Sequence, residues 1–131
     1  CVFDTNALIS AFLWDGSVSQ KLLFRMMSGG HELVSSQEIL EEFESVLKRD
    51  FNHSEETASD FRMQVTVMSL LVIPSEKVHA VEEDPDDDKI LECAIASSSE
   101  FVVTYDKHLL KLKEFHRAKI ITPEDALKLL G

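Results

Sequence analysis

Short apolar runs alternate with amphipathic stretches along the whole of this 131-residue chain. The runs predict five β-strands, at residues 1–4, 32–35, 70–73, 101–104 and 119–121. Between the runs, apolar residues recur at the spacing of a helix, which places them on one helical face. Strands that alternate with helices are typical of βαβ units and of a parallel sheet. The pattern therefore predicts an α/β fold.

Capping signals mark where several helices begin. Ser35 and Glu38 have the spacing of a capping box, Ser54 can cap a helix over residues 54–69, and Thr122 followed by Pro123 predicts a terminal helix. No repeat, linker or low-complexity tract divides the chain. Its length is that of one domain that can bury a core without a metal or disulfides. We expect residues 1–131 to form a single domain.

The composition limits the classes of protein that remain. Hydrophobic residues make up 44% of the chain, which argues against a disordered protein. The apolar runs are too short to cross a bilayer, and two cysteines are too few for a disulfide framework. No signal peptide is visible, although the chain starts at Cys1 and we expect a few residues to precede it. We therefore expect a cytoplasmic protein without a membrane partner.

Four acidic residues occupy positions that chemistry could use. Asp4 ends the first strand, Asp106 follows the fourth, and Asp87 falls in the first turn of a helix that follows an acidic run. Glu42 borders the buried stripe of the helix after the second strand. Ligands of open α/β sheets bind at the carboxyl ends of the strands. We expect three of these acids at that edge, with Glu42 leaning over it.

A cluster of carboxylates needs compensation by protons or cations. Two unit charges ~4 Å apart cost ~4 kcal/mol at an effective dielectric of ~20. Oxygen ligands alone favour hard ions such as Mg²⁺ or Mn²⁺. The five histidines are scattered and no His or Cys pair has zinc-ligand spacing. Walker A, G-x-S-x-G and G-x-G-x-x-G motifs do not occur, so P-loop, serine hydrolase and dinucleotide functions lack support.

Each acid also has an ordinary structural interpretation. Acids in the first turn of a helix stabilise its dipole, which could account for the run around Asp87. Glu42 could be a solvated helix residue like its neighbour Glu41, and Asp106 could cap the turn or helix that follows. Such separate structural roles explain less well why all four acids occur in one chain in this order.

The net charge of −11 argues against a protein that holds nucleic acid by bulk electrostatics. Bound cations would weaken that objection by reversing the local field. Residues 107–119 also contain five of the 13 Lys and Arg residues. This basic segment could bind a phosphate backbone, with Lys107, His108 and Lys111 as the candidates nearest Asp106. It could equally be a solvated loop.

Four segments resemble the PIN domain, a small metal-dependent ribonuclease family common among bacterial and archaeal toxins of toxin–antitoxin systems. They are Val2–Asn6, Ser35–Val46, 84–91 and Val102–Lys107, and they occur in family order. The Asp-Pro-Asp-Asp sequence at 84–87 resembles the subgroup described as toxin components.

The resemblance implies a three-layer α/β/α fold with a parallel five-stranded sheet. It also implies an acidic pocket for Mg²⁺ or Mn²⁺ made by Asp4, Glu42, Asp87 and Asp106. Asp87 has the family spacing to Ile90 and Ala94. Its rivals are Asp84, Asp86 and Asp88. The residues that would orient ligands and waters are Thr5, Asn6 and Thr104.

The function implied is a metal-dependent endoribonuclease that leaves 5′-phosphate and 3′-hydroxyl ends, as the toxin of a toxin–antitoxin pair. RNA, a cognate antitoxin and a homodimer or higher oligomer are the implied partners. Phe12, Leu13 and Trp14 could form such an interface, although core packing is their more common use. One alternative is a catalytically silent binding or oligomerisation module. Another is a housekeeping RNA-processing nuclease with the same chemistry.

Overall fold

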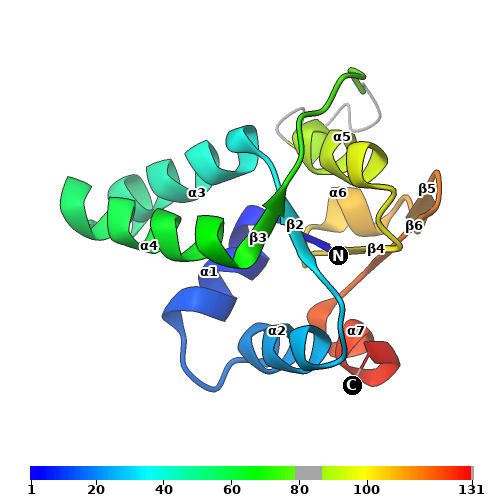
Figure 1. Ribbon diagram of the computed structural model, residues 1–131, viewed down its shortest axis with the longest axis horizontal. Coiled ribbons are helices and arrows are strands. Elements are labelled where there is room, and N and C mark those ends of the chain that lie inside the picture. Colours follow the sequence, from blue (N-terminus) through cyan, green and yellow to red (C-terminus); the bar gives the residue numbers. More distant parts are fainter. Residues whose placement is uncertain (79–86, 131) are drawn as a thin grey trace.

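The computed structural model describes residues 1–78 and 87–130, which form a mixed α/β fold around one sheet (Figure 1). The sheet has six strands in this part of the chain, in the order β3-β2-β1-β4-β6-β5. The strands are β1 (Val2–Phe3), β2 (Leu33–Ser35), β3 (Ser69–Leu71), β4 (Phe101–Val103), β5 (Glu114–Phe115) and β6 (Ala118–Ile121). All five predicted strands are present and pair in parallel.

The predicted count of five strands missed β5, which runs antiparallel to β6 at the edge of the sheet. Only His116 and Arg117 separate the two strands. A two-residue strand inside a basic segment produces no apolar run, so the hydrophobic pattern does not reveal it.

Helices lie on both sides of the sheet. α5 packs against β1, β2 and β4 on one side, while α2 packs against α1 and α7 on the other (Figure 1). The helices are α1 (Thr5–Leu13), α2 (Val18–Ser28), α3 (Gln37–Asp50), α4 (Glu55–Met68), α5 (Asp88–Ser97), α6 (Lys107–Leu110) and α7 (Pro123–Leu130). Within residues 1–78 and 87–130, none of them has the length and apolarity needed to cross a membrane.

Serine side chains cap the first turns of α2, α3 and α4. Ser54 accepts a hydrogen bond from the Thr57 amide at 3.1 Å, as predicted for the start of α4. The predicted cap of α3 was one residue early, because Ser36 rather than Ser35 accepts from the backbone of the first turn. Ser35 is the last residue of β2, where its backbone belongs to the sheet.

The central strands β1 and β4 determine where the site lies. Val2 pairs with Val102 and Phe3 with Val103, and all four side chains are fully buried. Continuous apolar runs of this kind are typical of parallel strands covered on both faces. The residues that follow are therefore neighbours, and the Asp4 amide donates to the Val103 carbonyl at 3.1 Å.

Replacing Phe43, a fully buried residue of α3 beside Glu42, should destabilise the fold. We expect Phe43→Ala to lower the free energy of unfolding by about 3–5 kcal/mol, because it removes apolar contacts and leaves a cavity. Chemical denaturation would measure the change. Met63→Ala is the matched control, since Met63 is 61% exposed and its loss should change stability by less than about 0.5 kcal/mol. Equal effects of the two substitutions would contradict this packing of α3.

Candidate active site

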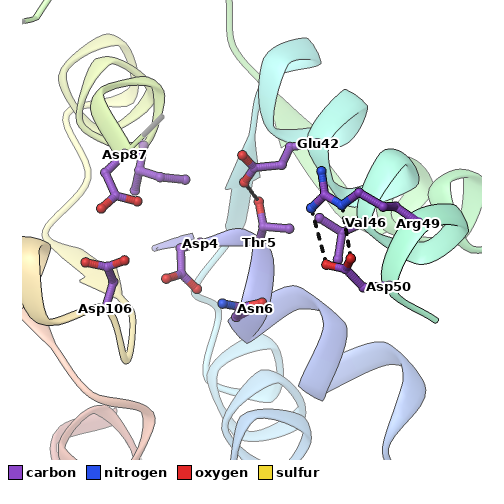
Figure 2. Close-up of a pocket in the computed structure, with 10 residues that line it drawn as sticks. Asp4, Thr5, Asn6, Glu42, Val46, Arg49, Asp50, Asp87 and Asp106 are labelled. Atoms are coloured by element: carbon purple, nitrogen blue, oxygen red, sulfur yellow. Dashed lines mark hydrogen bonds and ion pairs between the residues drawn. The ribbon is translucent and has the colours of Figure 1, made fainter. Parts of the chain in front are cut away.

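A cavity of about 220 Å³ opens beside the C-terminal ends of β1 and β4, and the four predicted acids all line it (Figure 2). Figure 2 shows the carboxylates of Asp87, at the start of α5, and of Asp106, after β4, facing each other beside Asp4. The remaining lining residues are Thr5, Asn6, Val46, Arg49, Asp50 and Ile90. The sheet edge thus brings together acids that are far apart in the sequence.

Asp4 is the most buried of the pocket acids, with 6% of its surface exposed. Its Oδ1 accepts a hydrogen bond from the Ala7 amide at 2.8 Å, so the side chain caps α1. Its Oδ2 accepts from the Thr104 hydroxyl. Burial raises the pKa of Asp4 to about 6, with the nearby charges of Asp106 and Glu42 acting in the same direction and the two hydrogen bonds opposing them.

Thr104 links Asp4 to Asp106. Its fully buried hydroxyl donates to the Asp4 carboxylate and accepts from the Asp106 amide at 2.8 Å. The Asp106 carboxylate in turn accepts from the amides of His108 at 2.8 Å and Leu109 at 3.3 Å. Asp106 therefore caps α6, as one interpretation of the sequence proposed, and still lines the pocket.

Glu42 is held by two partners on different helices. Its Oε1 accepts from the Thr5 hydroxyl, and its Oε2 forms an ion pair with Lys89 Nζ at 2.6 Å. Only 29% of the Glu42 side chain is exposed. Glu42 is therefore a half-buried, ion-paired residue of α3 rather than a freely solvated one.

Asp87 is the member of its acidic run that the structure places on the cavity. Asp88 is a buried residue of α5 and does not line the cavity. Asp84 and Asp86 lie outside the described residues. Position alone thus favours Asp87 over Asp88.

The other predicted residues lie around this centre in different ways. Thr5 and Thr104 contact the acids Glu42 and Asp4, whereas Asn6 is an exposed residue of the cavity wall. The candidate RNA-binding residues Lys107, His108 and Lys111 are exposed, on α6 or just after it. They are not part of the cavity lining.

The sequence interpretation missed several residues of the site. Val46, Arg49 and Asp50 follow Glu42 at the four-, seven- and eight-residue spacing that keeps residues on one helical face, so this signal was present. Arg49 Nε pairs with Asp50 Oδ1 at 3.0 Å. The sequence did not indicate a role for Lys89, because its partner Glu42 lies 47 residues earlier and such a distant contact leaves no local pattern.

Comparison with known families agrees with this geometry. The family model described as the PIN domain matches residues 1–108, a span that includes all four predicted acids. The chain belongs to the PIN domain family. PIN domains are commonly nucleases, and those nucleases typically use divalent metals. A search of curated proteins finds no match.

The carboxylate oxygens that line the cavity of this PIN domain suit a hard cation, although they do not converge on one point. Within residues 1–78 and 87–130, no three His, Cys, Asp or Glu side chains converge as a preformed metal site. Glu42 is occupied by Thr5 and Lys89, and Asp106 by the amides of α6. The donors are all carboxylates. Burial raises the pKa of Asp4, so a proton or a nearby cation would stabilise this carboxylate. The residues fit Mg²⁺ or Mn²⁺ in chemical type.

The raised pKa of Asp4 predicts an unusual dependence of stability on pH. The pKa of Asp4 is about 6 in the folded protein against 3.8 for an ordinary aspartate, so between these pH values the folded state binds the extra proton. Above pH 6 the charged Asp4 therefore lowers the free energy of unfolding by roughly 3 kcal/mol, since each unit of pKa difference is worth ~1.4 kcal/mol. This loss of stability disappears as the pH falls toward 4.

Denaturation in EDTA at pH 7.5 and pH 4.5 would measure this contribution. Asp4→Asn should remove it, whereas Asp60→Asn, at an exposed position on α4, should keep the pH dependence of the wild type. An NMR titration of the Asp4 carboxyl carbon should show a midpoint near 6. A midpoint near 4 would contradict the prediction.

Proposed function

We propose that this PIN domain is a metal-dependent endoribonuclease and the toxin of a toxin–antitoxin pair. The observation that carries the proposal is the cavity at the sheet edge, where the buried Asp4 shares one wall with Asp87 and Asp106. Clefts that hold titratable groups with perturbed pKa values are the usual candidates for active sites.

The acids divide into two groups in this proposal. Asp4 and Asp106 would hold Mg²⁺ or Mn²⁺ directly, with Asp87 and Glu42 completing the shell directly or through water. The metal, when bound, supplies activation of a water molecule and neutralisation of charge on the phosphate. Thr104 fixes the Asp4 carboxylate and the Asp106 backbone relative to each other, while Thr5 fixes Glu42.

The reaction is hydrolysis of an RNA phosphodiester. The oxygen of water forms a bond to phosphorus and loses its proton, and the bond from phosphorus to O3′ breaks. The departing O3′ takes up a proton, which leaves 5′-phosphate and 3′-hydroxyl ends. Lys107, His108 and Lys111 lie exposed next to Asp106, where they would bind the neighbouring phosphates of the strand.

The biological role in the proposal rests on the acidic sequence at 84–87 and its likeness to toxin components. We place the protein in the cytoplasm, with a cognate antitoxin that covers the acidic pocket and with a second copy as an oligomeric partner. Phe12 and Leu13 pack partly against the core, so they offer little to an interface. Trp14 is 51% exposed beside Phe51 and remains a candidate contact.

A catalytically silent module is the second candidate, and two observations favour it. The cation Lys89 already occupies Glu42, and the described residues contain no preformed metal group. A housekeeping RNA-processing nuclease would share the chemistry proposed here and would differ only in lacking an antitoxin.

An RNA cleavage assay would test the proposed activity. We expect cleavage with Mg²⁺ or Mn²⁺, none with EDTA, and a loss of at least about 100-fold in Asp4→Asn, because the metal supplies several kcal/mol of transition-state stabilisation. Asp60→Asn removes the same charge outside the pocket lining and should cleave like the wild type. Cation-dependent cleavage that survives Asp4→Asn would refute the assigned site, and no cleavage at all would favour the silent module.

The basic residues after Asp106 should contribute to RNA binding alone. We expect Lys107→Glu with Lys111→Glu to weaken binding of single-stranded RNA and to lower the slope of log affinity against log salt by about 1–2, because two phosphate contacts are lost. Mn²⁺ affinity should stay close to that of the wild type. Lys21→Glu with Lys128→Glu, at exposed positions on α2 and α7, is the control of equal charge. Equal losses of RNA affinity in the two double variants would indicate a general effect of charge rather than binding by the basic segment.

A further inference from the structure

Lys89 occupies an electrostatically unfavourable place in its helix. It is the second residue of α5, directly after Asp88. The N-terminal end of a helix carries a partial positive charge and favours acids over cations. A lysine there needs a compensating partner, and the ion pair with Glu42 provides one at 2.6 Å.

The Lys89–Glu42 pair is also poorly exposed for a surface ion pair. The exposed fractions of the two side chains are 18% for Lys89 and 29% for Glu42. The pair links α5 to α3, across 47 residues of sequence. Partial burial reduces screening by solvent and salt, so the pair holds its two members more firmly than an exposed pair would.

Glu42 belongs to the cavity wall, but Lys89 does not. Because Thr5 occupies Oε1 and Lys89 occupies Oε2, both oxygens of the carboxylate are engaged. A divalent cation that drew on Glu42 would therefore have to compete with the lysine. The nearby acids Asp4 and Asp106 instead accept hydrogen bonds from hydroxyl and amide groups.

We propose that Lys89 is a positioning residue that holds Glu42 while the pocket lacks a cation and releases it when a divalent cation binds. Lys89 thereby lowers the affinity of the site for the metal. The inference rests on the proposed function, because it takes the pocket to be a metal site. It goes further by proposing that Lys89 competes with the metal ion for the Glu42 carboxylate.

A titration of Mn²⁺, followed by the EPR signal of the free ion, would test the inference without any activity assay. Lys89→Met should bind Mn²⁺ on the order of tenfold more tightly, which is within the range of coupling energies for residues in contact. Lys89→Arg keeps the charge and should bind within about twofold of the wild type, since an arginine can also pair with a carboxylate.

A double-mutant cycle separates this competition from the general field of a positive charge. If Lys89 acts through Glu42, the effect of Lys89→Met should fall to less than about twofold when Glu42→Gln is also present. Arg49→Met removes a charge of the same sign from the cavity wall, and its effect should not depend on Glu42. An effect of Lys89→Met that is equal with and without Glu42→Gln would overturn the inference.

A measurement on the unaltered protein guards against a variant that fails to fold. In an NMR titration with Mg²⁺, the signals of Glu42 Cδ and Lys89 Nζ should shift with the same midpoint as Asp4 Cγ. Movement of Asp4 alone would overturn the role of Lys89 and leave the proposed metal site intact. If neither the wild type nor Lys89→Met binds Mn²⁺ or Mg²⁺, both the inference and the proposed metal-dependent function fail.

Discussion

The parallel pairing of β1 with β4 is the constraint on which the site depends. The paired residues Val2, Phe3, Val102 and Val103 are all fully buried. A shift in register would expose apolar side chains or bury polar ones, so the register is strongly specified. The pairing places Asp4 beside Thr104, and the Thr104 hydroxyl then connects the Asp4 carboxylate to the Asp106 backbone. The arrangement of Asp4, Thr104 and Asp106 at the sheet edge thus depends on the packing of the four apolar residues that precede them in β1 and β4.

The pocket acids serve structure and the candidate chemistry together. Asp4 caps α1 and Asp106 caps α6, so each carboxylate satisfies helix amides that would otherwise lack partners. At Asp4 the hydrogen bonds favour the charged form of the carboxylate, which partly offsets the cost of burying it. Capping and pocket formation therefore do not compete as explanations of these residues. The same helix ends that need acceptors deliver the carboxylates to the cavity.

The five parallel strands could be predicted because each leaves an apolar run in the sequence. The four acids could be placed at the sheet edge because Asp4 and Asp106 end or follow such runs, Asp87 begins a helix, and Glu42 borders the apolar face of another. β5 leaves no apolar run because it comprises two residues inside a basic segment, and the four residues of α6 were predicted only as a turn or helix after Asp106. The Lys89–Glu42 pair was also hidden, because contacts across 47 residues have no local signature. The family match supported the fold and the nuclease class, whereas the roles of individual acids stay predictions.

The charge balance of the pocket differs from the one that the sequence implied. Four carboxylates without compensation would require external cations for the fold to persist, but the protein provides part of that compensation itself. Lys89 pairs with Glu42, Arg49 pairs with Asp50, and the raised pKa of Asp4 allows a proton to bind near pH 6. The domain can therefore fold around an acidic cavity before any metal arrives. In the proposed metal site, binding would be an exchange in which a cation displaces Lys89 from Glu42 and, at pH values below about 6, a proton from Asp4.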